Sequence, residues 1–320
     1  MNRPAGAPPV KAARAAEAVG GAEVVEVVEY TDPLCPWAWG SEPVFRRLRA
    51  VLAGRVRLRR VHCILFEHDD DPAPDPDAET TWYTRYVEEI SAHTGAPRAA
   101  RLSRVAASSW PSSLVAKAAE AQGDRVAERV LRRLRETVFV LGDPADTLDS
   151  ALAAARGVPG LDPERLAADA ASGAVLRQVR ADRAEARRPV PEVLTVRGGS
   201  PHPGAAKETA DGGRRYALPT VLVRTSTGRR AVPGLRPFEE YAAALEELCP
   251  GQLRTPAPLP PALALEHHRT LTEPERRVLT EGRWPPPHAI RVDTGNGPLW
   301  LHPDEAATHP ATRPAPSAGP

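Results

Sequence analysis

The stretch TDPLCPWAW, residues 31–39, separates a β-branched run from an amphipathic one. Before it, Val24–Tyr30 has the composition of a buried central strand. After it, the residues from Pro36 to Gly54 place apolar side chains at helical spacing, with a proline at the start and a glycine at the end. Val56–Leu65 alternates well enough to form a second strand. The order strand, helix, strand predicts a right-handed βαβ unit.

A long helical block interrupts the predicted sheet. Residues 79–188 are almost wholly helical in pattern, and an aspartate that could cap a helix precedes several of the apolar runs. Strand signals resume at Leu218–Val223, and a turn leads to Arg229–Val232, which can pair back as a hairpin. The apolar spacing of Phe238–Leu248 predicts a final helix. A helical block between a βαβ unit and a ββα unit predicts an α/β protein with a thioredoxin-like core and an inserted all-helical domain.

The C-terminal region predicts a small appendage. Thr272 and Glu275 have the spacing of a capping box, so a short helix is expected to begin there. Gly295-Asn296-Gly297 is a strong signal for a hairpin turn between two short strands. A helix followed by a hairpin resembles a small winged-helix unit. The predicted organisation is a disordered leader (1–22), a thioredoxin-like core (23–66 and 214–249), an inserted helical domain (79–188), a loop (189–213), a helix–hairpin appendage (262–304) and a disordered tail (305–320).

Composition argues against several classes of protein. The chain of 320 residues has a net charge of +1 and no dense basic run, so nucleic-acid binding is not expected. No stretch of about 18 apolar residues exists, so no membrane span is expected. The first residues lack the apolar core of a secretory signal, and three cysteines are few for a disulfide-built secreted protein. We therefore expect a cytoplasmic protein.

Cys35 lies where the first predicted strand gives way to the first predicted helix. A helix N-terminus carries unsatisfied N–H groups and a partial positive charge, which together stabilise an anion. A thiol placed there is expected to have a pKa of roughly 3.5–7.5 instead of about 8.5, and its thiolate is the nucleophile of disulfide exchange. The alternative is a small apolar core residue, which a cysteine beside Pro36 and Trp37 at a turn fits poorly.

The segment DPLCPWAW (residues 32–39), Pro219 after the helical block, and the order of the units resemble the DsbA family of thioredoxin-fold oxidoreductases. The resemblance covers residues 24–248 and is closest to the cytoplasmic FrnE-like and Spx-adapter-like branches. It implies that Pro219 is cis and lies against the reactive sulfur, and that the backbone of Leu218 docks a substrate strand. Without the resemblance, Pro219 would be interpreted as an ordinary proline at a strand start.

Ala38 departs from the family pattern, because a second cysteine occupies this place in the usual Cys-x-x-Cys motif. A disulfide within the motif is therefore excluded, and three alternatives stay open. In the first, Cys35 acts as a single thiol and a low-molecular-weight thiol is the reductant. In the second, Cys63 at the end of the second strand is a distant resolving cysteine. In the third, the chain is a binding scaffold without catalysis. Burial is the simpler interpretation of Cys63, and helix-end packing that of Cys249.

Tryptophans near the loop are candidate binding residues. Pro36, Trp37, Ala38 and Trp39 form the predicted active-site loop. Trp37 and Trp39 are expected to line a substrate groove, although Trp39 is equally suited to the core. Trp110 begins a predicted helix of the insert and either faces the cleft or packs between helices. The histidines lack the spacing of a metal site, so no metal is expected.

Together these residues predict a thiol–disulfide oxidoreductase-like protein that acts through Cys35 without a bound cofactor. Its expected substrate is a protein disulfide or thiol, or a small electrophile, and an external thiol restores Cys35. One alternative is a non-catalytic adapter that binds a partner protein in the same cleft. Another is a kappa-type glutathione transferase or isomerase, which shares the fold with the helical insert. That class usually has a serine at the equivalent turn, so Cys35 counts against it.

Overall fold

The structure is a computed structural model. It describes residues 25–52, 56–67, 73–198, 200–251, 253–255 and 257–312. The predicted leader, residues 1–22, lies outside the described residues, as does the end of the predicted tail.

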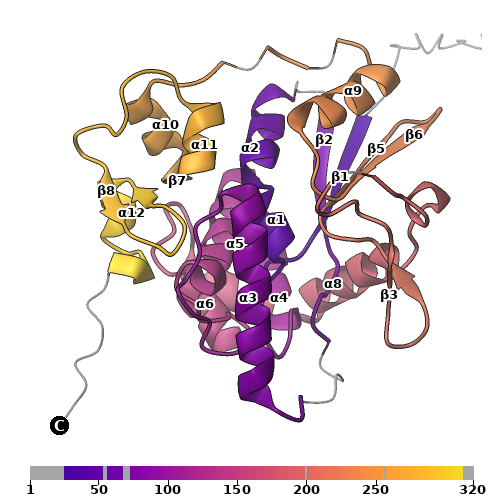
Figure 1. The fold of residues 1–320 in the computed structure, drawn as a ribbon, viewed down its shortest axis with the longest axis horizontal. Coiled ribbons are helices and arrows are strands. Elements are labelled where there is room, and N and C mark those ends of the chain that lie inside the picture. The colour runs from indigo at the N-terminus through magenta and orange to yellow at the C-terminus, as the bar shows by residue number, and fades with distance from the viewer. Residues whose placement is uncertain are drawn as a thin grey trace, which may run out of the picture.

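A four-stranded sheet forms the centre of the molecule (Figure 1). The strands are β1 (Val25–Thr31), β2 (Val56–His62), β5 (Thr220–Arg224) and β6 (Arg229–Pro233), in the order β2-β1-β5-β6. β1 and β2 are parallel, whereas β5 is antiparallel to both β1 and β6. Nearly all side chains of β1 are buried. Burial on both faces explains why this strand has a continuous β-branched run and not an alternating pattern.

Helices cover both faces of this sheet. α2 (Glu42–Val51) and α9 (Phe238–Leu248) pack against one face through a shared apolar cluster. α8 (Gly173–Ala186), the last helix of the insert, packs along β2. Its terminal Ala186 joins the apolar cluster on the other face. This thioredoxin-like arrangement, with a helical insert between its two halves, agrees with the predicted fold class.

The predicted single helix from Pro36 to Gly54 is wrong, because it is divided into α1 (Pro36–Gly40) and α2. Pro43 lies in the first turn of α2, where its missing N–H prevents the hydrogen bond that would continue α1. Gly40 allows α3 to approach closely, since a Cβ at this position would lie 2.5 Å from the Cγ2 atom of Thr94.

The helical insert contains six helices within residues 76–186, which agrees with the almost wholly helical pattern of residues 79–188. They are α3 (Pro76–Thr94), α4 (Trp110–Glu120), α5 (Asp124–Phe139), α6 (Leu148–Ala155), α7 (Pro163–Ala170) and α8. Small side chains dominate the shared faces of α4, α6 and α7. Alanine faces let the helices approach closely, so the alanine-rich composition of this block serves its packing.

The C-terminal region forms a separate small unit. It comprises α10 (Pro261–His268), β7 (Thr270–Thr272), α11 (Glu273–Leu279), β8 (Ile290–Val292) and β9 (Leu299–Leu301), with a sheet in the order β7-β9-β8. The Thr272 side chain caps α11, and Glu275 returns the bond to the backbone of Thr272, which is the predicted capping box. The sequence reasoning missed α10, because its short apolar run lies among prolines.

Two predicted irregular segments are partly wrong. Within the predicted loop 189–213, residues 191–193 form a short 3₁₀ helix, and β3 (Lys207–Glu208) pairs with β4 (Arg214–Arg215). Within the predicted tail, α12 (Pro303–Ala306) and a 3₁₀ turn at Pro310–Thr312 are ordered against the body. Proline and small polar residues dominate both segments, so their sequences predict loops. The contacts that order them come from elements that are distant in the sequence.

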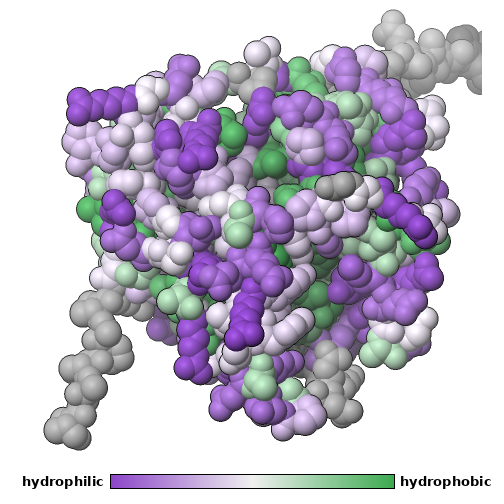
Figure 2. All heavy atoms as spheres, in the orientation of Figure 1, coloured by the Kyte–Doolittle hydropathy of each residue, from purple (hydrophilic) through white to green (hydrophobic). Residues whose placement is uncertain are grey.

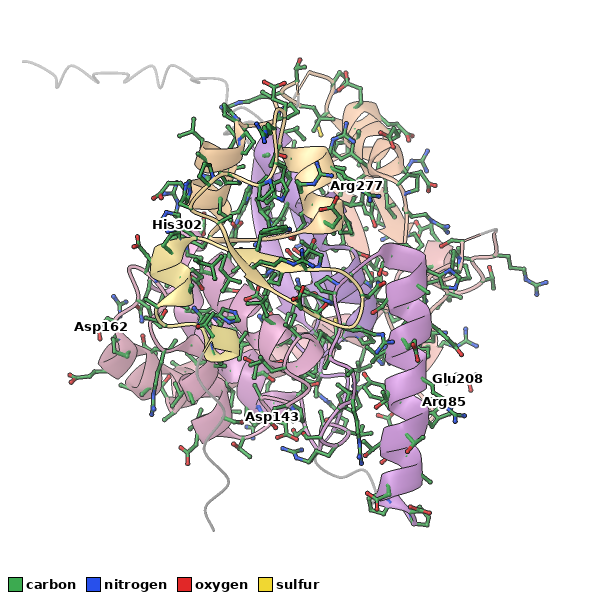
Figure 3. All side chains as sticks on the ribbon, turned by 60° about the vertical axis from the view of Figure 1, so that its left-hand side comes forward. Arg85, Asp143, Asp162, Glu208, Arg277 and His302 are labelled. Carbon is green, nitrogen blue, oxygen red and sulfur yellow. The ribbon has the colours of Figure 1, made fainter. Side chains whose placement is uncertain are left out.

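The outside of the molecule is polar. Figure 2 shows a face on which hydrophilic residues predominate and hydrophobic ones form only small areas. Charged side chains such as Arg85, Glu208 and Arg277 are exposed and point outward (Figure 3). Among the described residues, no helix is long and apolar enough to cross a membrane.

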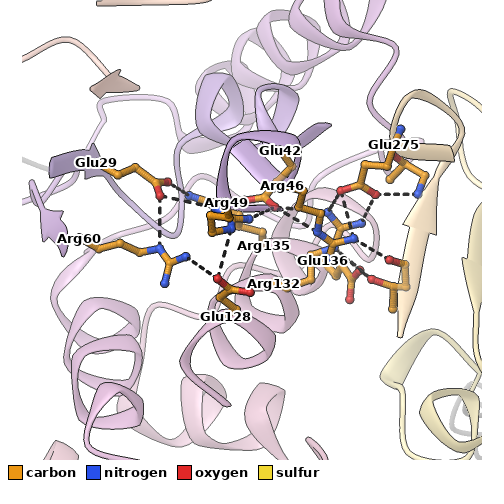
Figure 4. Close-up of polar contacts among 12 residues, drawn as sticks. Glu29, Glu42, Arg46, Arg49, Arg60, Glu128, Arg132, Arg135, Glu136 and Glu275 are labelled. Atoms are coloured by element: carbon orange, nitrogen blue, oxygen red, sulfur yellow. Dashed lines mark hydrogen bonds and ion pairs between the residues drawn. The ribbon is translucent and has the colours of Figure 1, made fainter. Parts of the chain in front are cut away.

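A network of buried ion pairs joins the core, the insert and the C-terminal unit (Figure 4). Arg132 of α5 donates to both carboxylate oxygens of Glu275, at 2.7 and 3.0 Å, and to Glu136 at 2.6 Å. Arg135, one turn further along α5, pairs with Glu42 of α2. The network holds equal numbers of arginines and glutamates: Arg46, Arg49, Arg60, Arg132, Arg135, Glu29, Glu42, Glu128, Glu136 and Glu275.

The ordered end of the chain is attached to the same helix. The ring nitrogen Nε2 of His309 lies 2.9 Å from the carboxylate of Glu136, and both side chains are buried. Glu305 of α12 pairs with Arg133 of α5. These contacts explain why residues 305–312 are ordered despite a sequence that resembles a tail.

Candidate active site

Cys35 lies directly before α1, at the end of the turn that follows β1. Its backbone is extended, with φ −89° and ψ 117°, and Pro36 occupies the first helical position. The Cys35 N–H donates to the carbonyl of Asp32 at 3.2 Å, and the Cys35 carbonyl accepts from Trp39 at 3.0 Å. The side chain is only 3% exposed. The sequence therefore located Cys35 correctly at a strand-to-helix turn, but not its burial.

The Cys35 thiol faces the backbone that precedes β5. Its Sγ atom lies 3.8 Å from the carbonyl oxygen of Leu218. The Leu218–Pro219 peptide bond is cis, and the Pro219 carbonyl accepts a hydrogen bond from Gly234 at 2.8 Å. The structure thus brings together Cys35, Leu218 and Pro219, which are separated by more than half of the chain.

Burial raises the pKa of the Cys35 thiol to about 11. The backbone N–H groups of Ala38 and Trp37 lower this pKa, as the helix N-terminus predicts, while the carboxylate of Asp32 raises it. The predicted low pKa is therefore wrong for this conformation, because the loss of water around the sulfur outweighs the helix end. A thiol with this pKa is about one part in ten thousand thiolate at pH 7.

An apolar cavity of about 260 Å³ opens beside Cys35. Its walls are largely aromatic, and two basic side chains, Lys207 and Arg215, come from the hairpin of β3 and β4. The hydroxyl of Tyr83 is buried and has no hydrogen-bond partner within the described part of the chain. The aromatic lining consists of Trp37, Phe66, Trp82, Tyr83 and Tyr86. An unpaired hydroxyl in an apolar wall is free to bond a ligand.

His202 holds Trp37 in place and is a site residue that the sequence reasoning missed. Its ring stacks on the Trp37 indole with centroids 4.8 Å apart, and its Nε2 atom lies 2.8 Å from the Leu218 carbonyl oxygen. Burial lowers the pKa of His202 to about 4, so the neutral ring donates its N–H to Leu218 at pH 7. Trp37 also donates its indole N–H to Tyr86, at 2.8 Å. No short-range signal places His202 here, since it lies in a proline-rich segment.

Asp32 is a second buried group of the site. Its carboxylate accepts from the backbone of Leu34 and Leu65, each at 2.8 Å, and from the Ser109 hydroxyl at 3.0 Å. Burial raises the pKa of Asp32 to about 6 despite these bonds. Asp32 is not among the predicted site residues, but its side chain ties the Cys35 loop to the residues that follow β2 and to the start of α4.

The other predicted loop residues divide between the cavity and the core. Ala38 is completely buried beside Cys35. Trp39 belongs to the core: its indole N–H donates to the Pro97 carbonyl at 2.9 Å, and the Arg132 guanidinium lies 4.3 Å from its ring centroid. Trp110 donates to Glu67 at 3.3 Å and packs against the apolar cluster of the insert. Pro36 and Trp37 line the cavity, whereas Trp39 and Trp110 are not among its lining residues.

Cys35 and Cys63 are free thiols. Cys63 follows β2, is completely buried in the same apolar cluster as Cys35, and has its Sγ atom 3.5 Å from the Val61 carbonyl oxygen. Burial raises the pKa of Cys63 well above its ordinary value. Cys249 ends α9, where its Sγ atom lies 3.0 Å from the Leu245 carbonyl oxygen.

The chain is similar to proteins of known sequence and structure. It is 29% identical over 169 residues to the ClpXP adapter protein SpxH of Shouchella clausii, covering 52% of this chain and 54% of that protein. It is 27% identical over 167 residues to SpxH of Halalkalibacterium halodurans, covering 49% and 53%. The chain thus spans about half the length of the curated relatives it matches.

A solved structure shares the fold. It is a Nitrosomonas europaea protein, provisionally described as a protein disulfide isomerase, with a TM-score of 0.54 and 14% identity, covering 70% of this chain and 96% of that one. The thioredoxin family matches residues 29–188, which is half of the chain and includes the Cys35 loop, α1 and the whole helical insert. This protein therefore belongs to the thioredoxin family.

Proposed function

We propose that the protein carries out thiol–disulfide exchange through the single thiol of Cys35. The observation that carries this proposal is the position of the Cys35 sulfur, at the start of α1, opposite the carbonyl of Leu218 and beside an aromatic cavity. Family membership supports thiol chemistry at this turn. The free thiols of Cys35 and Cys63 fit a cytoplasm in which low-molecular-weight thiols keep cysteines reduced.

The proposed reaction uses two external thiols for each substrate disulfide. The Cys35 thiolate attacks one sulfur of the disulfide, the S–S bond breaks, and the other sulfur leaves as a thiolate. An external thiolate then attacks the Cys35 sulfur, which releases the reduced substrate and leaves the external thiol bonded to Cys35. A second external thiolate attacks the external sulfur of that bond, frees Cys35 and forms the oxidised external disulfide. Two electrons pass from the external thiols to the substrate.

Ala38 makes the external thiol necessary, because no second cysteine follows in the loop. Cys63 remains a candidate resolving cysteine, since it lies in the same apolar cluster as Cys35. Attack by Cys35 also requires the closed site to open, because the thiolate must gain water or a donor to offset its burial. Substrate binding in the cavity would supply that change.

The proposal is tested by the pH dependence of Cys35 alkylation, measured by mass spectrometry in a Cys63→Ser/Cys249→Ser background. Alone, the protein is expected to react slowly, with a pKa well above 8.5. With oxidised glutathione it is expected to form a mixed disulfide on Cys35, which free glutathione reverses. Cys35→Ser is the control and forms none. The proposal would be rejected if Cys35 formed no mixed disulfide under conditions in which the exposed thiol of a model peptide forms one.

Ala38→Cys tests the role assigned to the external thiol. This variant restores two cysteines in the loop, so we expect an internal disulfide that lowers the mass by about 2 Da under mild oxidation. Turnover of a disulfide substrate should then rise, and it should depend less on the glutathione concentration. An unchanged dependence on glutathione, with the disulfide formed, would contradict the single-thiol reaction.

A second candidate function is that of an adapter without catalysis. Two observations favour it: the curated relatives are ClpXP adapters, and the Cys35 thiol is buried and protonated. In this case the aromatic cavity binds a partner protein. Binding of the purified chain to purified ClpXP should then be the same for wild type and Cys35→Ser. A loss of that binding in Cys35→Ser would argue for a thiol-dependent interaction instead.

A further inference from the structure

A second hollow, of about 210 Å³, lies where α2, α5 and α10 meet. This is the junction of the core, the helical insert and the C-terminal unit. Part of its lining is the edge of the buried ion-pair network, including Arg46, Arg49 and Arg60 (Figure 4). These three arginines are already neutralised, because the network contains as many glutamates as arginines. Any further basic group at this hollow therefore adds an excess of positive charge.

Two further arginines supply that excess. Arg125 and Arg129 lie one turn apart on α5 and both line the hollow. Like charges at this spacing repel each other and destabilise a helix. Arg129 donates one bond, to the Pro159 carbonyl at 3.2 Å, and its Nε atom is buried without a partner among the described residues. The one carboxylate of the lining that lies outside the network is Asp124.

Two histidines of α10 complete the lining. His267 and His268 are adjacent, with ring centroids 4.7 Å apart. Burial, and then Arg46, lower the pKa of His268 well below its ordinary value. Burial and Arg125 lower that of His267, against the opposing effect of Glu128. Both rings are therefore neutral at pH 7 and can donate an N–H without adding charge.

We propose that this hollow binds a phosphate group, held by Arg125 and Arg129 of α5 and by His267 and His268 of α10. No described carboxylate lies within ion-pair distance of either guanidinium, although Glu305 and Glu266 act on Arg129 from further away. Two such guanidinium groups suit a dianion, and their planar N–H pairs match phosphate oxygens. The volume equals that of about seven water molecules, at roughly 30 Å³ each, which accommodates phosphate or pyrophosphate. The bound anion bridges the insert and the C-terminal unit, and it is independent of Cys35.

Calorimetric titration of the full chain with inorganic phosphate and with pyrophosphate tests the site at low ionic strength. We expect one site for each, and at least a tenfold loss of affinity in Arg125→Gln/Arg129→Gln. The matched control is Arg177→Gln/Arg180→Gln, which removes the same charge from the exposed side of α8 and should stay within about twofold of wild type. Equal losses in both double variants, or no binding by wild type, would overturn the proposal.

Histidine titration by NMR locates the anion and covers the case in which the double variant does not fold. Arg125 is exposed, so Arg125→Gln alone should fold and still weaken binding. Saturating pyrophosphate is expected to raise the pKa of His267 and His268, because the dianion offsets the nearby arginines. Citrate serves as the carboxylate comparison and should bind more weakly. If pyrophosphate binds but leaves both histidine titrations unchanged, the anion lies elsewhere and the assignment is wrong.

Discussion

The Cys35 cavity and the ion-pair network bury polar groups in opposite ways. In the network, each carboxylate meets at least one guanidinium, and Arg132 alone contacts Glu136, Glu275 and the ring of Trp39. At the cavity, the Tyr83 hydroxyl has no hydrogen-bond partner in the described part of the chain, and the Cys35 sulfur lies 3.8 Å from the Leu218 carbonyl oxygen. Every charged group of the network has an oppositely charged partner, although Glu29 Oε1 and Arg135 Nε accept or donate no hydrogen bond among the described residues. The cavity instead leaves uncharged and protonated groups to which a ligand can bond.

The pKa values of buried groups also shift in different directions in the network and at the cavity. Burial would raise the pKa of Glu42, but Arg135, Arg49 and Arg46 lower it well below its ordinary value. At the cavity, burial prevails, and the pKa values of Cys35 and Asp32 are both raised. Burial alone therefore does not identify a functional site. A buried group whose charge is left uncompensated is the better indicator, since a ligand or a conformational change can supply the missing partner.

The largest predicted effect comes from breaking the network. Arg135→Met leaves the buried carboxylate of Glu42 without its partner on α5 and removes a 2.6 Å hydrogen bond to Thr31. We expect the free energy of unfolding to fall by about 3–5 kcal/mol, because an unpaired buried charge remains. Urea denaturation of wild type and variant measures the loss. Arg177→Met, on the exposed side of α8, should change stability by less than about 0.5 kcal/mol. A similar small change for Arg135→Met would show that the network is not structural.

A smaller effect is expected from the titration of Asp32. Its pKa of about 6 in the folded protein exceeds the value of about 3.9 in an unfolded chain, so the folded state binds this proton more tightly. The resulting stability is complete below pH 4 and is lost as the pH rises through 6, by about 2–3 kcal/mol. His202 acts in the opposite sense, since its lowered pKa costs stability as the pH falls from 6.5 towards 4.

Because the two groups oppose each other, the measurement is a difference between wild type and Asp32→Asn. Urea midpoints at intervals from pH 4 to pH 7 should show that wild type gains stability relative to the variant as the pH falls. Most of the change in this difference should fall between pH 5 and pH 7, around the folded pKa of about 6. A constant difference across this range would mean that Asp32 is ionised throughout, as the network glutamates are.

The sequence predicts features that depend on neighbouring residues better than it predicts contacts between distant ones. The Cys35 turn, the strands β1 and β2 and the Thr272 capping box follow from signals within a few residues. The partners of Arg132 do not, because Glu275 is 143 positions away and both residue types usually lie on the surface. The pKa of Cys35 was predicted with the wrong sign for a related reason. The helix end is local and visible in the sequence, but the burial that outweighs it depends on the whole fold.

The smallest predicted effect is a difference in stability between two tyrosine-to-phenylalanine variants. The Tyr30 hydroxyl bonds a carboxylate, whereas Tyr83 lines the cavity. The Tyr30 hydroxyl donates to Glu185 at 3.0 Å, so Tyr30→Phe should cost about 1–3 kcal/mol. The Tyr83 hydroxyl has no hydrogen-bond partner among the residues that the structure describes, so Tyr83→Phe should leave stability unchanged or raise it by up to about 1 kcal/mol. Urea denaturation of the two variants measures both changes.

The reactivity of Cys35 should respond to these two variants in the opposite way to stability: Tyr83→Phe should lower it, whereas Tyr30→Phe should not. If the Tyr83 hydroxyl bonds a ligand in the cavity, Tyr83→Phe slows the reaction of Cys35 with oxidised glutathione about fivefold to tenfold, which corresponds to one hydrogen bond. Tyr30→Phe should react at the wild-type rate, because Tyr30 is not among the residues that line the cavity. A Tyr83→Phe variant that is destabilised and fully reactive would mean that its hydroxyl has a structural role, and the cavity would then be as self-contained as the network.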